Sequence, residues 1–341
     1  MKKKLFDPQC PVGRTTTGIV NGHSSGSINL NGISYQWAYN LWEQMLNNTW
    51  FTKEVDMTAD ADQYKLLLPT ERRGYDKALS QLIFMDGLQT NNTPDNVNGW
   101  VTAPEVNMTL VRQSFEEALH SQAYAVMVDS ISANTSEIYE MWRTDKLLYE
   151  KNELIFKTYE KYGALAEDDD EAKIYMIAAN QILEGIYFYS GFSFFYVLAR
   201  AGKMLGSAQM IRFIQRDELT HLSLFRNMFN TMKRENSAIF TDEVEENVRQ
   251  MIREGVELEI KWGKHIISGG ILGLTDELIE GFIKFLGNER AKAMKLGVLY
   301  PDNTETNLPW FNDFSSFNDI KTNFFEGNNA NYSKGVDMSD F

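Results

Sequence analysis

The distribution of proline constrains the fold of this chain more than any other feature. The seven prolines lie at positions 8, 11, 69, 94, 104, 301 and 309, so residues 105–300 contain none. Proline interrupts helices because it lacks a backbone N–H and its ring clashes with the preceding turn. A long segment without proline that is rich in Leu, Met, Glu, Lys and Ala predicts long helices. We therefore expect an all-α protein.

Helical patterns cover most of the chain, and no reliable alternating strand pattern or internal repeat accompanies them. The expected helices span residues 33–47, 70–88, 104–131, 136–162, 170–202, 203–233, 241–266 and 274–295. Residues 1–30 are rich in Gly, Ser, Thr and Asn, and the C-terminal residues are rich in Asn, Asp and Ser. We expect an irregular N-terminal arm at 1–30, one helical domain at 31–312 and a flexible tail at 313–341.

Composition and charge exclude several classes of protein. A formal net charge of −14 argues against a nucleic-acid-binding surface. Cys10 is the one cysteine, so no intrachain disulfide or cysteine metal cluster can form. The N-terminal lysines precede no apolar segment of the kind that a secretion signal needs. The apolar segment 182–198 contains Glu184, which a bilayer would make costly. We expect a cytoplasmic protein without membrane or nucleic-acid partners.

Two of the four histidines follow a glutamate at a spacing of three residues. The pairs are Glu117 with His120, and Glu218 with His221. On a helix this spacing puts the carboxylate and the imidazole on one face, where both can reach one metal ion. Each pair could instead be a surface salt bridge or a capping contact, but both motifs have apolar neighbours. The pattern therefore predicts two metal-binding motifs on separate helices.

Two such helices need a carboxylate from each of two further helices to complete a dimetal site. Asp86 lies 31 residues before Glu117, and Glu184 lies 34 residues before Glu218, each among aliphatic residues. Either acid alone is more often a hydrogen-bonded structural residue, but beside these motifs both are candidate ligands. Oxygen and imidazole ligands without thiolate suit iron or manganese. We expect two metal ions per chain, Fe and/or Mn.

Tyr124 lies on the same helical face as the first motif, four positions after its histidine. A tyrosine beside an oxidising metal pair can lose an electron and a proton to give a phenoxyl radical. Such a radical persists only where quenchers and solvent are excluded, and Phe188, Phe192 and Ile214 are candidates for its apolar surroundings. Ordinary core packing explains the spacing of all four residues equally well.

These segments resemble the small, radical-generating subunit of class I ribonucleotide reductase, a ferritin-like protein. The resemblance covers most of the chain and rests on residues 82–86 (LIFMD), 115–124 (FEEALHSQAY), 183–188 (LEGIYF) and 216–221 (RDELTH). It implies a ferritin-like helical bundle with additional helices, and a ribonucleoside-diphosphate reductase β subunit that is active only with its large subunit. The implied metal ligands are Asp86, Glu117, His120, Glu184, Glu218 and His221, with Glu117 and Glu218 as bridges. The implied radical site is Tyr124, with Phe188, Phe192 and Ile214 as its pocket.

The resemblance also implies a relay that carries an oxidising equivalent to the large subunit. Trp50 matches the relay tryptophan, Asp217 the acid that links it to His120, and Tyr332 the tyrosine that continues the relay in the tail. Residues 336–341 (VDMSDF) resemble the peptide that docks on the large subunit. Members of this family contain di-iron, dimanganese or mixed centres, and we expect a homodimer through the packing of long helices. The oxidant can be stored on Tyr124 or on the metals, and manganese members can need an activating flavoprotein.

Two other functions stay open. One is a ligand-binding oxidase or monooxygenase component on the same fold, which would have no use for Trp50 linked to Asp217 or for Tyr332. The other is a ferritin-like iron-storage protein, which is usually much smaller. The relay residues and the tail favour the radical-generating subunit.

Overall fold

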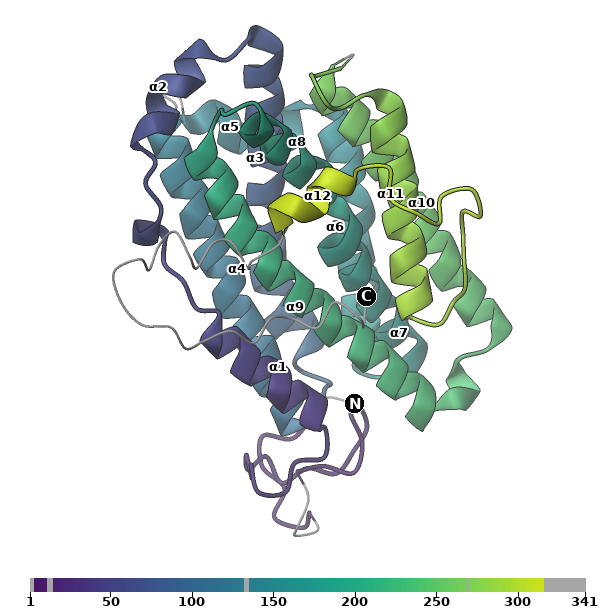
Figure 1. Ribbon diagram of the computed structural model, residues 1–341. Helices are drawn as coiled ribbons and strands as arrows, with labels where there is room; N and C mark the ends of the chain where they lie inside the picture. Colours follow the sequence, from purple (N-terminus) through teal and green to yellow (C-terminus); the bar gives the residue numbers. More distant parts are fainter. Residues whose placement is uncertain (1–2, 11–14, 132–134, 269, 316–341) are drawn as a thin grey trace.

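The computed structural model describes residues 3–10, 15–131, 135–268 and 270–315, and within them the expected all-α fold is confirmed (Figure 1). Apart from two isolated bridges, these residues contain no β-strand. The α-helices are α1 (Gln36–Asn47), α2 (Thr58–Leu66), α3 (Pro69–Asn92), α4 (Pro104–Ile131), α5 (Thr135–Thr144), α6 (Lys146–Leu165), α7 (Asp170–Ile182), α8 (Tyr189–Arg200), α9 (Leu205–Glu235), α10 (Asp242–Ile267), α11 (Asp276–Ala293) and α12 (Pro309–Ser315). Short 3-10 turns are η1 (Thr52–Glu54) and η4 (Ser237–Ile239), and π-helical turns are η2 (Thr93–Val97) and η3 (Leu183–Tyr187).

Four long helical segments form the centre of the molecule: α3, α4, α9 and the continuous run α7–η3–α8. Helix α3 contacts α4 and α8, and α9 contacts α4, α7 and α8. Helix α10 packs on α6, α7 and α11, while α1 packs against α4 and α9 (Figure 1). This arrangement surrounds one interior space with the four segments on which the candidate ligands lie.

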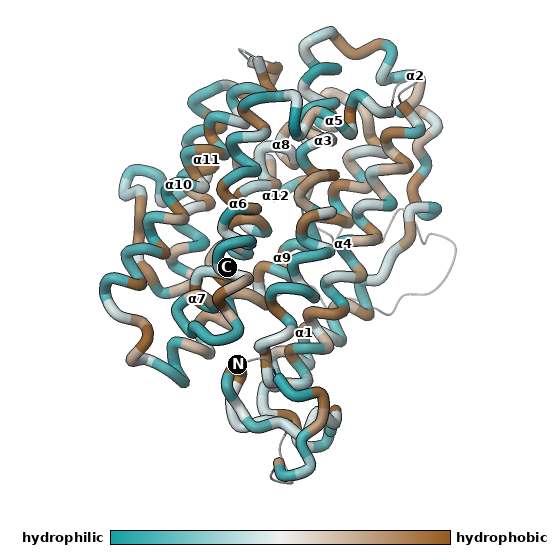
Figure 2. The backbone as a smooth tube through the Cα atoms, turned by 180° about the vertical axis from the view of Figure 1, so that it is seen from behind, coloured by the Kyte–Doolittle hydropathy of each residue, from teal (hydrophilic) through white to brown (hydrophobic). Residues whose placement is uncertain are grey.

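The helix ends follow from local chemistry. Helix α10 begins where the side chain of Thr241 accepts the N–H of Val244, and its first turn carries three acids. Its last turn carries Lys264 and His265, so charges at both ends complement the helix dipole. Hydrophilic and hydrophobic residues alternate along α10 in Figure 2, as expected for a helix with one buried face.

Two of the expected helices are interrupted, and two short helices were not expected. The predicted helix 136–162 is wrong as a single element, because Asp145 is extended and caps α6 by accepting the N–H groups of Leu147 and Leu148. The predicted helix 170–202 is interrupted by the π turn η3. Helices α2 and α12 were not predicted from the sequence because they are short, with 9 and 7 residues.

The N-terminal arm contacts the central helices, whereas most of the C-terminal tail lies outside the described residues. The described residues of the arm contain no helix, and Glu105 of α4 anchors the chain near it by accepting the N–H groups of Ser34 and Tyr35. Helix α12 includes residues 313–315, and the chain from 316 onward, with Tyr332 and the expected docking peptide 336–341, lies outside the described residues. The division into arm, domain and tail stays a prediction.

The run Asp170–Arg200 is long and apolar enough to cross a membrane by length and composition. Its most apolar window is entirely buried inside the molecule, against the other central helices. Burial in the protein core therefore accounts for its apolar character, as the position of Glu184 within it predicts.

Candidate metal centre

Six buried side chains from the four central segments meet in two overlapping groups. One group contains Asp86, Glu117, His120 and Glu218, and the other contains Glu117, Glu184, Glu218 and His221. Within each group the potential ligand atoms lie within 4.8 Å of one another, and all six side chains have no solvent exposure. Glu117 and Glu218 belong to both groups, so they lie between two potential metal positions.

His120 turns its Nδ1 atom toward the carboxylates of the first group. This nitrogen lies 3.1 Å from Glu218 Oε1, 3.4 Å from Asp86 Oδ2 and 3.5 Å from Glu117 Oε2. The spacing of three residues puts Glu117 and His120 on one face of α4, and α3 and α9 supply the other two acids. One imidazole nitrogen therefore faces three carboxylate oxygens from three helices.

His221 has the equivalent position in the second group. Its Nδ1 lies 2.9 Å from Glu218 Oε2, 3.2 Å from Glu117 Oε1 and 3.8 Å from Glu184 Oε2. The two oxygens of each shared glutamate thus face different histidines. The ring centroids of His120 and His221 are 6.0 Å apart. This arrangement suits a pair of carboxylate-bridged metal ions.

Whether metal ions fit the cluster can be tested from the hydrogen bonds that its buried polar atoms make or lack. Several of its buried polar atoms have no hydrogen-bond partner among the described residues. These atoms are Asp86 Oδ1 and Oδ2, Glu117 Oε2, His120 Nδ1, Glu184 Oε2 and Glu218 Oε1. Buried polar groups normally have partners, so a concentration of unsatisfied oxygen and nitrogen atoms fits a site that binds an ion. Cations bound by these oxygen and nitrogen atoms would satisfy them, and such donors suit iron or manganese.

Burial and the surrounding charge favour the protonated forms of several groups in the cluster. Burial, together with neighbouring negative charge, raises the pKa of Asp86 to about 8 and that of Glu184 well above its ordinary value. Burial alone would lower the pKa values of His120 and His221, but the negative charge of the surrounding acids and the contacts of the two Nε2 atoms with Asp217 and Glu116 outweigh it and raise both well above the ordinary value. Metal ions must displace these protons in order to bind.

Each histidine is oriented by an acid that belongs to the other motif. His120 on α4 places its Nε2 atom 3.3 Å from Oδ2 of Asp217 on α9. His221 on α9 places its Nε2 atom 2.9 Å from Oε2 of Glu116 on α4. Such contacts fix the orientation of a ligating imidazole. Glu116 was not predicted from the sequence, although an acid directly precedes each motif glutamate.

Glu184 is held by two amide side chains that the sequence analysis also missed. Its Oε1 atom accepts hydrogen bonds from Nε2 of Gln89 and Nε2 of Gln113, both at 2.7 Å. The Oε2 atom is left for a ligand. Gln113 lies four residues before Glu117 on the ligand face of α4, which is the signal that could have identified it.

Tyr124 is fully buried, and its hydroxyl group has no hydrogen-bond partner among the described residues. Burial, followed by the negative charge of Asp86 and Glu218, raises its pKa well above the ordinary value. The phenol therefore keeps its proton, so loss of an electron has to be accompanied by loss of that proton. Phe188, Phe192 and Ile214 are fully buried, and the two phenylalanine rings stack at 5.7 Å. Their role as the wall of a radical pocket stays a prediction.

A hydrogen-bonded chain leads from the cluster through Asp217 to Trp50. Trp50 is 2% exposed and donates from Nε1 to Asp217 Oδ2 at 2.7 Å, the oxygen that also faces His120. Its ring stacks on Phe213 with centroids 5.0 Å apart. Burial tends to raise the pKa of Asp217, but the charge of Arg216 and the hydrogen bonds from His120 and Trp50 outweigh it, so the pKa lies below the usual value. The carboxylate therefore stays ionised between the two rings.

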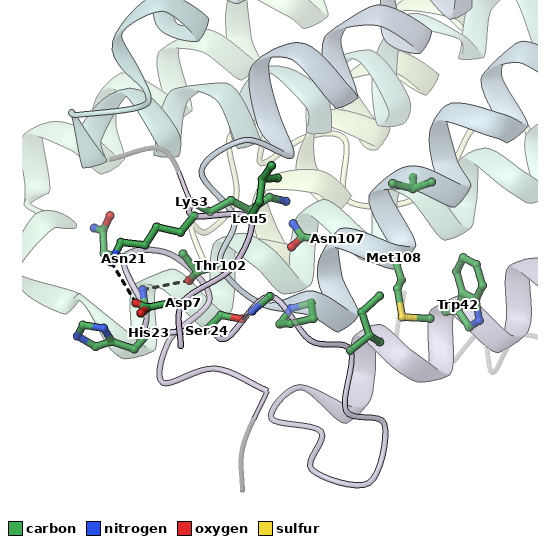
Figure 3. A pocket seen from close by; sticks show the side chains of 16 residues that line it. Lys3, Leu5, Asp7, Asn21, His23, Ser24, Trp42, Thr102, Asn107 and Met108 are labelled. Atoms are coloured by element: carbon green, nitrogen blue, oxygen red, sulfur yellow. Dashed lines mark hydrogen bonds and ion pairs between the residues drawn. The ribbon is translucent and has the colours of Figure 1, made fainter. Parts of the chain in front are cut away.

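A cavity of about 700 Å³ lies elsewhere, between the N-terminal arm, α1 and α4 (Figure 3). Its lining includes Lys3 and His23 of the arm, Trp42 of α1 and Met108 of α4, and none of the six clustered residues. The cavity is therefore separate from the candidate metal centre.

Comparisons with known sequences match this chain to a known protein family. The sequence model of the family described as "Ribonucleotide reductase, small chain" matches residues 27–308. The ribonucleoside-diphosphate reductase subunit beta of Treponema pallidum (strain Nichols) is 38% identical over 345 residues, covering 99% of this chain and 97% of that protein. The subunit of the same name from Halalkalibacterium halodurans is 34% identical, covering 98% of this chain and 96% of that protein.

Solved structures are similar over nearly the same length. The ribonucleotide reductase R2 subunit from Clostridium botulinum superposes with a TM-score of 0.88 at 42% identity, covering 92% of this chain and 98% of that chain. The dimanganese(II)-NrdF structure from Streptococcus sanguinis has a TM-score of 0.70 at 20% identity, covering 85% of this chain and 99% of that chain. The second similarity is evidence of a shared fold.

Proposed function

This chain belongs to the ribonucleotide reductase small-chain family, and from that premise we propose which of its residues generate, store and export the oxidant. The expected ferritin-like bundle is confirmed, and the function is that of a small subunit of ribonucleoside-diphosphate reductase, an oxidoreductase that works with a large subunit. We propose that Asp86, Glu117, His120, Glu184, Glu218 and His221 bind two metal ions, iron, manganese or one of each.

The single observation that carries this assignment is that Glu117 and Glu218 belong to both ligand groups. An isolated salt bridge would not need two shared carboxylates facing two histidines. The unsatisfied buried oxygens around these residues support the same assignment, because without cations they would be costly.

When bound, the two ions would supply the oxidising power that follows their reaction with oxygen or a reduced oxygen species. The residues of the chain provide the surroundings for that chemistry. The ligand side chains are closed to solvent, which protects a radical from quenching. Tyr124 keeps its hydroxyl proton, so its oxidation has to release that proton together with an electron, and the carboxylate of Asp86, which acts on this phenol, would accept the proton. We propose Tyr124 as the site of the stored radical.

Export of the oxidising equivalent would follow the chain of hydrogen bonds from His120 through Asp217 to Trp50. Asp217 is the acceptor for both rings, so it can hold the indole proton in place while Trp50 is oxidised and reduced. Tyr332 in the tail would continue the relay, and residues 336–341 would dock on the large subunit.

The chain also offers a surface for the homodimer that we propose. Large apolar side chains on α1 and α4, which pack against each other, are open to solvent: Leu46 is 46% exposed, Val111 58% and Phe115 48%. An apolar surface shared by adjacent helices indicates an interface. We further propose that the protein works in the cytoplasm and that a flavoprotein activates it if the metals are manganese.

Deletion of residues 328–341 tests this function. The truncated chain should bind two metal ions as before, because the centre lies in the central helices, but it should not support nucleotide reduction with the large subunit. Metal analysis and a reduction assay give both values. Normal turnover by the truncated chain would refute the proposed export route, and formation of an iron mineral core would favour storage instead.

A further inference from the structure

The helix that carries Glu184 is interrupted at that residue by the π turn η3, and side chains of other helices hold this turn. The backbone carbonyl of Tyr187, the last residue of η3, accepts a hydrogen bond from Lys151 Nζ at 2.8 Å and another from Gln81. These donors come from α6 and α3. π-helical turns are rare and are frequently found at functional sites. Here the turn depends on contacts from outside its own helix.

Lys151 belongs to a fully buried ion pair with Glu259 of α10. Glu259 Oε1 accepts the backbone N–H of Ser190 at 2.9 Å, in the first turn of α8. The lysine thus binds a carbonyl at the end of η3, while the glutamate binds an amide at the beginning of the next helix. Each charge has the sign that its helix end favours. The pair fixes both sides of the junction between η3 and α8.

Arg290 of α11 holds the residue that directly follows Glu184. Its Nε donates to the carbonyl of Gly185 at 3.0 Å, and its guanidinium also donates to Tyr189 Oη at 3.2 Å. Arg290 is 7% exposed and forms no ion pair within the described part of the chain. Its two hydrogen bonds to Gly185 and Tyr189 therefore stabilise the buried guanidinium charge. A Cβ atom at position 185 would lie 2.7 Å from Arg290 Nε, so glycine is required for this approach.

Of the three carboxylates that face Nδ1 of His221, that of Glu184 lies farthest from this nitrogen. Its Oε2 lies 3.8 Å from His221 Nδ1, whereas the two shared glutamates lie 2.9 and 3.2 Å from the same nitrogen. Because Gln89 and Gln113 hold Oε1 of Glu184, the place of its Oε2 atom depends on these two amides together with the backbone that carries the residue. That backbone is the π turn.

We propose that three residues outside the metal centre are positioning residues for Glu184. They are Lys151, Glu259 and Arg290. By holding η3 they determine where Glu184 lies, and so they set the affinity of the metal position beside His221 without touching the metal. The inference rests on the proposed metal centre and adds the contacts that tune one of its two positions.

The double variant Lys151→Met/Glu259→Gln tests this inference, because it removes both charges and keeps the side chains similar in size. The full-length protein is titrated with Mn(II) and followed by electron paramagnetic resonance. The wild-type chain should bind two ions with a spin-coupled spectrum. The variant should bind the first ion as tightly as the wild type and the second about 10- to 100-fold more weakly, the usual loss for an outer contact. At two equivalents its spectrum should be that of isolated ions.

The variant Lys233→Met/Glu245→Gln is the matched control, because it removes an ion pair between α9 and α10 that does not touch η3. Both of its affinities should equal those of the wild type. Hydrogen exchange should also be faster at amides 185–191 in the test variant and unchanged in the control. If the double variant does not fold, Arg290→Lys keeps the charge but removes the Nε donor, and the same selective loss is expected.

Unchanged binding of the second ion, or equal weakening of both ions, would overturn the inference. The second result would mean that the ion pair supports only the general stability of the fold. A wild-type chain that never gives a coupled pair of ions would instead refute the proposed metal centre, so the two failures are distinguishable.

Discussion

Each ligand histidine contacts an acid that belongs to the opposite Glu-x-x-His motif. We therefore predict that each of these two acids controls the metal position beside the histidine that it contacts. Asp217 belongs to the motif of α9, yet it contacts His120 of α4 at 3.3 Å. Glu116 belongs to the motif of α4, yet it contacts His221 of α9 at 2.9 Å. Substitution of Asp217 should therefore weaken the position beside His120, and substitution of Glu116 should weaken the position beside His221.

The size of each effect follows from the bonds that are lost. Asp217→Asn keeps the shape of the side chain and can still accept from Trp50, but it removes the charge that orients His120. Loss of such an outer contact costs about 10- to 100-fold in metal affinity, or about 1.4 to 2.7 kcal/mol. Glu116→Gln should lie toward the upper end of this range because its contact with His221 is shorter.

Chains with a single remaining metal position provide the assay. His221→Ala leaves the position beside His120, and His120→Ala leaves the position beside His221. Titration with Mn(II), followed by the resonance of the free ion, gives the dissociation constant in each background. Asp217→Asn should have its full effect in the His221→Ala background and almost none in the other, and Glu116→Gln should show the reverse. If Asp217→Asn weakened only the position beside His221, the crossed arrangement would be wrong.

Three further predictions concern protons, the radical and packing. Metal loading should release protons, because the pKa of Asp86 is raised to about 8 and the pKa values of Glu184 and the two ligand histidines lie well above their ordinary values, and bound ions displace the protons that these groups hold. Affinity should therefore rise with pH, and calorimetry in buffers of different ionisation enthalpy that found no release would contradict this. Tyr124→Phe should retain two metals and lose the radical signal in electron paramagnetic resonance; nucleotide reduction by this variant would place the oxidant on the metals. Gly74→Ala should lower the free energy of unfolding in urea by about 1 to 3 kcal/mol, because its Cβ would lie 2.4 Å from Phe194 Cε2; unchanged stability would contradict the packing.

The sequence predicted the parts of the site that depend on helix periodicity. The spacing of three residues between Glu117 and His120 requires a shared helical face, and the structure has α4 unbroken through both residues. The absence of proline from 105 to 300 predicted long helices, which the structure has. The link between Trp50 and Asp217 followed from family resemblance, since 167 residues separate them.

Features that depend on contacts between helices could not be predicted in the same way. Glu116 was missed because its partner His221 lies 105 residues away on another helix. The π turn at Glu184 was missed because donors from other helices, such as Lys151, hold its carbonyls. Local propensity contains no information about those donors. The break before α6 was missed because Asp145 is a cap only in the extended conformation that the fold gives it.

The most direct test is a crystal structure of the full-length protein loaded with Mn(II), with anomalous diffraction data collected at the manganese edge. The predicted result is two peaks about 3.5 to 4 Å apart, with Glu117 and Glu218 each contacting both ions. A single peak, or two peaks too far apart for one carboxylate to reach both, would contradict the dimetal centre.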